Sequence, residues 1–215
     1  MRRLVHNKMQ LVKKIIVIGP ESTGKSTLCK QLAEHYQTLW CPEYAREYLT
    51  LHGTSYSYDD LLTIAKGQLA LEERMMESVK CKMQNEKSRL SQKSKVKSQE
   101  ETQPATYNTQ HNPILFVDTD MYVMKVWCEY VFGKCHSFIL EKVAEQKADL
   151  YLLCNIDLPW VKDELREYED IKVREELFNI YRDILNNQSV PWALIKGNEE
   201  QRLQAAIAAV EKIAD

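Results

Sequence analysis

The stretch KIIVIGPESTGKST, residues 14–27, decides the fold class of this chain. Its apolar run Ile15–Ile18 predicts a buried strand, and a complete GxxxxGK(S/T) match follows directly. Such a match would arise by chance in roughly one per cent of chains of this length. The glycines let the loop curl so that successive N–H groups point at phosphate oxygens, and the positive end of the following helix faces the same charge. The stretch therefore predicts the strand, phosphate-binding loop and helix of a P-loop NTPase.

The same loop predicts how ATP and Mg²⁺ would be held as cofactors. We expect Lys25 to bridge the β- and γ-phosphates of ATP and the Ser26 hydroxyl to ligate Mg²⁺. The apolar run Ile114–Val117 leads into Asp118, which is the candidate carboxylate on the metal side, with a helix cap as its alternative role. The predicted ATP-binding residues are Gly19, Glu21, Ser22, Thr23, Gly24, Lys25, Ser26 and Thr27.

Apolar runs alternate with amphipathic stretches along the chain, which predicts an α/β fold with a parallel sheet and flanking helices. The predicted strands are residues 14–18, 38–41, 114–117, 150–154 and 192–195. We expect these five strands to have the kinase-like order, in which the strand after the P-loop is not the neighbour of the first strand. A single domain over residues 1–215 agrees with the chain length.

The stretch 80–112 differs in composition from the rest of the chain. It holds seven lysines or arginines against three glutamates, and very few large apolar side chains. Such a segment adds little to a hydrophobic core, so we predict a flexible insertion that connects a helix to a strand. Contact with an anionic partner is the alternative role for its positive charge.

Composition and charge argue against several classes of partner. The formal net charge of -2 provides no general attraction to nucleic acid or to an anionic membrane. The apolar runs are far shorter than the ~20 residues of a transmembrane helix, and Met1–Lys14 lacks the apolar stretch of a secretory signal. The six cysteines form no CxxC pair, which favours reduced thiols over a metal cluster. We therefore expect a cytoplasmic protein that binds a small molecule and neither nucleic acid nor a membrane.

The residues around the P-loop favour a kinase over other P-loop proteins. ATPases that activate water commonly have a glutamate directly after the strand-end aspartate, where this chain has Thr119. A GTPase would carry a guanine-reading NKxD segment, and the nearest match, Cys154–Asp157, lacks the lysine. A kinase instead needs a carboxylate near the acceptor hydroxyl and arginines that close over the transferred phosphoryl group.

The chain offers both the carboxylate and the arginines. Glu43 follows the second predicted strand, where parallel strands open on a ligand crevice, and it is the candidate that orients or deprotonates the acceptor. Asp120 is the alternative base, and a helix cap is the alternative role for Glu43. We expect Arg46, Arg166 and Arg174 to neutralise charge on the phosphoryl oxygens, with surface ion pairs as the alternative. Arg166 and Arg174 lie where a small kinase carries its lid.

Four segments together resemble the ribosylnicotinamide kinase domain of the NadR family. They are Gly19–Ser26, Glu43–Glu47, Phe116–Asp120 and Pro159–Arg166. The resemblance implies transfer of the γ-phosphoryl group of ATP to the 5′-hydroxyl of nicotinamide riboside, a step of NAD biosynthesis. It also implies a substrate-binding set, which is Glu43, Tyr44, Arg46, Asp120 and Trp160. Members of the family have a tryptophan before the Glu-Tyr pair, where this chain has Pro42.

An ATP-switched binding module is the alternative from another functional class. In such a protein, ATP occupancy would gate a protein or lipid partner through the basic insertion. Steady-state turnover distinguishes the two, because a kinase consumes ATP in proportion to added acceptor, whereas a switch turns over slowly and ignores nucleosides.

Overall fold

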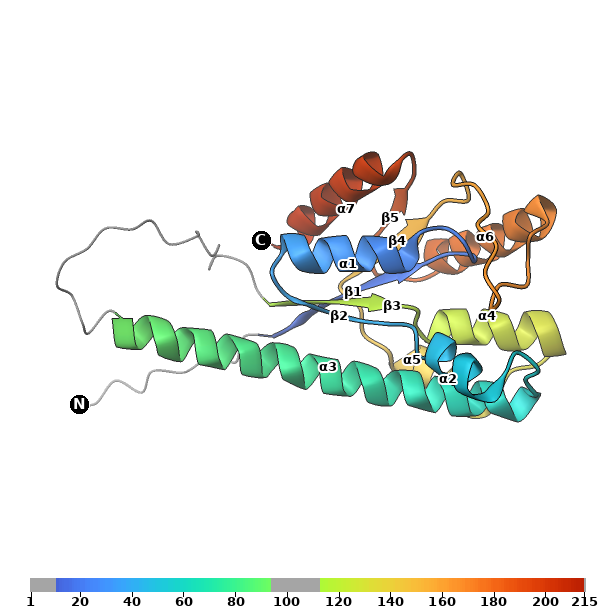
Figure 1. Ribbon diagram of the computed structural model, residues 1–215, viewed down its shortest axis with the longest axis horizontal. Coiled ribbons are helices and arrows are strands. Elements are labelled where there is room, and N and C mark those ends of the chain that lie inside the picture. The colour runs from blue at the N-terminus through green and yellow to red at the C-terminus, as the bar shows by residue number, and fades with distance from the viewer. Residues whose placement is uncertain (1–10, 94–112, 215) are drawn as a thin grey trace.

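A sheet of parallel strands lies between two layers of helices (Figure 1). The computed structural model describes residues 11–93 and 113–214. In this part of the chain the sheet has the order β2-β3-β1-β4-β5, and every neighbouring pair of strands is parallel. The strands are β1 (Lys13–Ile18), β2 (Leu39–Cys41), β3 (Ile114–Asp118), β4 (Leu150–Cys154) and β5 (Trp192–Ile195). The predicted strands and their predicted order are confirmed, since β3 separates β2 from β1.

Both faces of the central strands β1, β3 and β4 are buried, as expected for parallel strands that are covered by helices. One layer consists of α1 (Lys25–His35) and α7 (Glu199–Ala214). The main helices of the other layer are α3 (Tyr58–Lys93), α4 (Met121–Phe132) and α6 (Ile171–Asn186). Ile15 and Val17 of β1 pack toward α1 and α7, whereas Ile16 and Ile18 pack toward α3, α4 and α6. Because the P-loop follows β1 directly, it emerges at the carboxyl end of the sheet.

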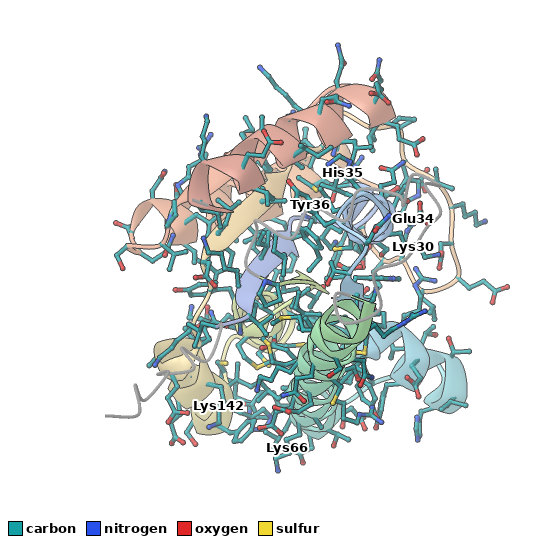
Figure 2. The ribbon with its side chains drawn as sticks, turned by 90° about the vertical axis from the view of Figure 1, so that its left-hand side faces the viewer. Lys30, Glu34, His35, Tyr36, Lys66 and Lys142 are labelled. Atoms are coloured by element: carbon teal, nitrogen blue, oxygen red, sulfur yellow. The ribbon has the colours of Figure 1, made fainter. Side chains whose placement is uncertain are left out.

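A third apolar cluster joins α2 (Tyr44–His52), α3, α4 and α5 (Ser137–Glu145). Its buried side chains include Leu61 and Ile64 of α3, Met124 of α4 and Ile139 of α5. The labels in Figure 2 mark the two sides of the sheet, with Lys66 and Lys142 on the side of α3 and α5, and Lys30, Glu34, His35 and Tyr36 on the side of α1. The cluster fixes α2, which follows β2 directly, against α3 and α4.

Helix α3 is longer than the sequence predicts, because it continues to Lys93 through the first part of the stretch 80–112. The prediction of a loop from Lys80 onward was therefore wrong for residues 80–93. These residues include no proline or glycine and are rich in Lys, Gln, Glu, Met and Arg, which are strong helix formers. Residues 94–112 lie outside the described part of the chain, so a flexible insertion there, like the single domain, stays a prediction. Neither α3 nor any other described helix combines the length and the apolar character needed to cross a membrane.

Candidate active site

The loop between β1 and α1 has the curled backbone that the motif predicts. Gly19 has φ +145°, and a Cβ there would lie 2.7 Å from the Cys154 carbonyl oxygen, so only glycine fits. Gly24 caps the N-terminus of α1 in the left-handed conformation. Lys25 Nζ donates hydrogen bonds of 3.0 Å to the carbonyl oxygens of Gly19 and Pro20. The ammonium group and the N-terminus of α1 thus lie at the same cavity, which favours a bound polyphosphate.

The metal-side pair is assembled from two parts of the chain that are distant in sequence. Ser26 Oγ in the first turn of α1 donates a 2.5 Å hydrogen bond to Asp118 Oδ2 at the end of β3. Asp118 is 0% exposed, and burial, reinforced by the negative charge of Glu43, raises its pKa to about 6. Lys25 and the hydrogen bond from Ser26 oppose that rise. A hydroxyl and a carboxylate oxygen are hard ligands of the kind that Mg²⁺ prefers, so the donor set fits the predicted metal.

Asp120, the other candidate carboxylate, caps α4. Its Oδ1 accepts hydrogen bonds from the backbone N–H groups of Tyr122 (2.9 Å) and Val123 (3.3 Å). Its Oδ2 accepts a 3.0 Å hydrogen bond from the Tyr151 hydroxyl, and burial raises its pKa to about 6. Among the described residues, those that line the cavity include neither Asp120 nor Asp118, but Asp118 contacts the lining residue Ser26. The structure thus gives the helix-cap role to Asp120 and not to Asp118, and the acceptor role of Asp120 stays a prediction.

Glu43 lies where the chain turns from β2 into α2. It is the N-cap residue of α2, but its side chain makes no capping hydrogen bond in the described part of the chain and lines the cavity instead. The negative charge of Glu43 repels that of the Asp118 carboxylate and so raises the pKa of Asp118. This position beside the metal-side pair is where a phosphoryl acceptor would approach.

Gln68 of α3 holds this turn, and sequence reasoning missed it. The side chain is 1% exposed, its Oε1 accepts a 2.7 Å hydrogen bond from the Tyr44 N–H, and its Nε2 donates to the Pro42 carbonyl at 3.4 Å. The neighbouring Gly67 is required, because a Cβ there would overlap the Tyr44 ring. A glycine and an amide side by side on an apolar helix face were the sequence signal for such a close approach. The Tyr44 ring therefore packs against α3 at Gly67, and Tyr44 is not among the described residues that line the cavity.

The segment between β4 and α6 folds over the P-loop as a lid. Arg166 Nη1 donates a 3.3 Å hydrogen bond to Ser22 Oγ, and Arg174 Nη2 donates a 3.4 Å one to the Ser22 carbonyl. Their guanidinium carbons lie 5.9 Å and 5.5 Å from the centre of the Trp160 ring. Burial lowers the pKa of Arg174. Both predicted arginines thus contact the P-loop, Arg166 from the lid and Arg174 from the first turn of α6. Arg166 is one of the described lining residues, whereas Arg174, which is 3% exposed, and Trp160 are not.

Two further contacts hold the lid in place. Arg46 of α2 lines the cavity and forms an ion pair with Asp163 of the lid, with an N–O distance of 3.1 Å. The Arg46 side chain is 49% exposed, so this pair contributes little stability. Glu21 of the P-loop accepts hydrogen bonds from the backbone N–H groups of Glu167 (2.9 Å) and Tyr168 (3.2 Å), and burial raises its pKa in spite of them. Glu21, which we predicted to bind ATP, anchors the lid to the P-loop.

The P-loop, Glu43, Arg46 and Arg166 line one cavity at the carboxyl ends of the strands, where α2, α4 and α6 gather (Figure 1). All the predicted ATP-binding residues line it. A second set of lining residues, called here the aromatic end, is apolar and aromatic, and sequence reasoning missed it. It is formed by Leu49 of α2, Val123, Val126, Trp127 and Tyr130 of α4, and Leu177 and Tyr181 of α6. Apolar and aromatic residues at helical spacing directly after the strand-end aspartate were the signal for this face of α4.

Arg202 of α7 ties the P-loop to two neighbouring loops, and sequence reasoning missed it as well. Its guanidinium donates to the carbonyl oxygens of Thr23 (3.0 Å), Asn155 (2.9 Å) and Gly197 (2.8 Å), and it forms an ion pair with Asp157. Arg202 is 4% exposed. A buried cation with these partners holds the backbone of the P-loop against the segments that follow β4 and β5. An arginine next to the apolar stripe of α7 was the sequence signal for this role.

Comparisons with known proteins agree with this architecture. A family model described as an AAA domain matches residues 14–202. The chain belongs to the AAA domain family. Two relatives are the trifunctional NAD biosynthesis/regulator proteins NadR of Escherichia coli (strain K12) and Salmonella typhimurium (strain LT2), and each is 24% identical over 189 residues. The match covers 86% of this chain and 38% of each relative, so this member of the family spans well under half of their length.

Solved structures share the fold of this AAA domain. The crystal structure of NadR protein in complex with NR has a TM-score of 0.66 and 20% identity, over 94% of this chain and 50% of that one. Thymidylate kinase from Ehrlichia chaffeensis has a TM-score of 0.54 and 14% identity, over 95% of this chain and 99% of that one. The predicted resemblance to the NadR family and the predicted kinase-like P-loop fold are both confirmed.

Proposed function

We propose that this protein is an ATP-dependent kinase that transfers the γ-phosphoryl group to the hydroxyl of a nucleoside-like acceptor, and that the acceptor is nicotinamide riboside. The observation that carries the proposal is one cavity that is lined by the P-loop, by Glu43 and by the apolar and aromatic set from α2, α4 and α6. Structures of NadR in complex with NR, and with NAD and AMP-PNP, support it by their similar fold. A nucleoside kinase needs such a cavity, with one end for phosphates and one end for a ring.

At the ATP end, the groups of this chain would bind and orient the triphosphate. Backbone N–H groups of the P-loop would bind phosphate oxygens, and Lys25 would exchange the carbonyls of Gly19 and Pro20 for the β- and γ-phosphates. Mg²⁺, when held by Ser26 and Asp118, would neutralise charge on the transferred group. The charge of Lys25 and the hydrogen bond from Ser26 favour the ionised form of the Asp118 carboxyl, which is the form that can bind a metal ion.

At the point of transfer, Glu43 would hold the acceptor hydroxyl and accept its proton. The transition state of phosphoryl transfer is loose, so orientation of the hydroxyl matters at least as much as removal of its proton. Arg166 and Arg174 already contact Ser22 of the P-loop and would bind the equatorial oxygens as charge develops there. A closed lid would also keep water from competing with the acceptor.

The aromatic end of the cavity suits the ring of nicotinamide riboside. That ring carries a positive charge, which is attracted by the faces of aromatic side chains, and Trp127 and Tyr130 line this end. Pro42 stands where the NadR family has a tryptophan. The aromatic residues of α4 are therefore proposed to take over the contact with the acceptor ring.

A panel of nucleosides with ADP release as the readout tests the proposal. We expect ADP to form in proportion to nicotinamide riboside, faster than with uridine, cytidine or thymidine, and we expect nicotinamide mononucleotide as the product by mass spectrometry. Lys25→Ala is the control, because loss of one preorganised charge donor lowers kcat by about 10²-fold or more. Slow turnover that ignores every nucleoside would refute the kinase and favour an ATP-switched binding module. Faster turnover with another nucleoside would refute only the choice of acceptor.

A further inference from the structure

A chain of hydrogen bonds connects the aromatic end of the cavity to the lid and to the P-loop. Trp127, which lines the cavity, donates its Nε1–H to the Tyr56 hydroxyl at 2.8 Å. The Tyr56 hydroxyl donates to Glu167 Oε2 of the lid at 2.9 Å. The backbone N–H of Glu167 donates to Glu21 Oε2 of the P-loop, also at 2.9 Å. Helix α4, the link between α2 and α3, the lid and the P-loop are thereby joined.

The direction of this chain follows from the chemistry of its groups. An indole N–H can only donate and an ionised carboxylate can only accept, so Tyr56 accepts from Trp127 and donates to Glu167. Burial raises the pKa of the Tyr56 hydroxyl, which therefore stays protonated and remains a donor at physiological pH. A hydrogen bond to a carboxylate is roughly twice as strong as one between neutral groups. The bond from Tyr56 to the exposed Glu167 is therefore the charge-assisted link between Trp127 and the lid.

The ring of Tyr56 is held separately from its hydroxyl. It packs edge-on against the rings of Trp127 and Phe132, with centres 5.0 Å and 6.3 Å apart. Tyr56 itself is not among the residues of the described chain that line the cavity. Removal of the hydroxyl alone would therefore break the hydrogen-bond chain while the aromatic packing remains.

We propose that Tyr56 is a positioning residue that couples acceptor binding at Trp127 to the seating of the lid on the P-loop. The inference rests on the proposed kinase function and deepens it. An acceptor ring packed on Trp127 fixes the indole N–H, which holds the Tyr56 hydroxyl toward Glu167 and keeps the lid arginines over the P-loop. A seated lid excludes water, so ATP is committed to transfer when the acceptor is present. By linkage, acceptor and nucleotide each tighten the binding of the other by the same factor.

Calorimetric titration of the full chain measures this coupling. The probe is AMP-PNP with Mg²⁺, titrated with and without saturating nicotinamide riboside into the wild-type protein and into Tyr56→Phe. We expect the acceptor to tighten AMP-PNP binding to the wild type, and we expect this gain to fall by about tenfold in Tyr56→Phe, as for the loss of one hydrogen bond to a charged group. The affinity for AMP-PNP without the acceptor should change far less, because the proposed contribution of Tyr56 depends on an acceptor ring that fixes Trp127.

Tyr58→Phe is the matched control, because it removes a hydroxyl close by from a tyrosine that stacks on His136 with ring centres 3.7 Å apart. It should keep the coupling of the wild type. Glu167→Ala on the exposed lid should lose the coupling as Tyr56→Phe does, and the double variant should lose no more. If Tyr56→Phe does not fold, Glu167→Ala tests the same link, and its affinity for AMP-PNP alone is then measured as well, because Glu167 also lines the cavity.

The outcomes separate this inference from the proposed function. Coupling that survives in Tyr56→Phe, or in Glu167→Ala, would overturn the inference. Acceptor-dependent ADP release by a wild type that shows no coupling would overturn it too, and would leave the kinase function standing. A wild type without acceptor-dependent ADP release would overturn both.

Discussion

Substitution of Glu43 by glutamine separates the proposed acceptor role from a structural one. The neutral side chain keeps its size but can no longer accept a proton from the acceptor. We expect Glu43→Gln to lower kcat by about 10²-fold, which is the usual contribution of a positioned general base. The affinity for AMP-PNP and the Mg²⁺ requirement should stay near those of the wild type, because Lys25, Ser26 and Asp118 are unchanged.

The structure also predicts the sign of the change in stability. Burial and then the charge of Glu43 raise the pKa of Asp118 from 3.8 to about 6. A carboxyl group whose pKa is higher in the folded state than in the unfolded state lowers the free energy of unfolding as the pH rises from about 4 to 6. Loss of the charge at Glu43 removes part of this cost, so the melting temperature at neutral pH should stay level or rise. Loss of a helix cap would instead cost about 1 kcal/mol.

Initial rates and thermal melting of the same samples distinguish these roles. Glu47→Gln on the exposed face of α2 is the matched control, and its kcat should equal that of the wild type. A Glu43→Gln enzyme with full kcat and a lowered melting temperature would refute the reasoning and return Glu43 to the role of a helix cap.

Three other substitutions test the metal side, the cap of α4 and the anchor on α7. Ser26→Ala should raise the Mg²⁺ concentration needed for half-maximal rate, and an unchanged Mg²⁺ titration would contradict the ligand role of a hydroxyl that contacts Asp118 at 2.5 Å. Asp120→Asn should keep kcat near that of the wild type. The pKa of Asp120 is about 6, so the wild type should lose stability as the pH rises from about 4 to 6, and urea unfolding should show a smaller loss in Asp120→Asn. A tenfold loss of kcat in this variant would instead place Asp120 in the site. Arg202→Met leaves the Thr23 carbonyl without its donor, so the free energy of unfolding should fall by about 3 kcal/mol and AMP-PNP should bind more weakly. Wild-type affinity for AMP-PNP in calorimetry would contradict the anchor role.

Asp118 at the end of β3 and Asp120 just after it show that a sequence pattern can locate carboxylates without deciding the role of each. Asp118 and Asp120 both follow an apolar strand, and metal binding, a helix cap and acceptor binding were all open to such residues. The start of α4 at Met121 decided between them, because Asp120 became its N-cap residue and turned its oxygens to the helix and to Tyr151. The orientation of Asp118 toward Ser26 required α1 and β3 to meet in space.

The tryptophans show the same limit. The sequence analysis assigned Trp160 to the substrate by family resemblance, whereas the structure places it against the lid arginines and brings Trp127 to the cavity. Which aromatic side chain lines the cavity depends on how the lid folds back over the P-loop. The sequence could not predict how the lid folds, because the segment between β4 and α6 forms no helix or strand and has no regular apolar periodicity.

The sequence by itself determined the P-loop, the five strands and the kinase-like order of the sheet. The P-loop and the strands depend on glycine conformation and on short apolar runs, which can be recognised within a few consecutive residues, whereas the order was expected from the class of P-loop kinases. Only the tertiary structure decided that Gln68, Arg202 and Tyr56 support the site. Each of them acts through hydrogen bonds to segments far away in the sequence, and such bonds, worth about 1 kcal/mol apiece, leave no periodic pattern in the chain.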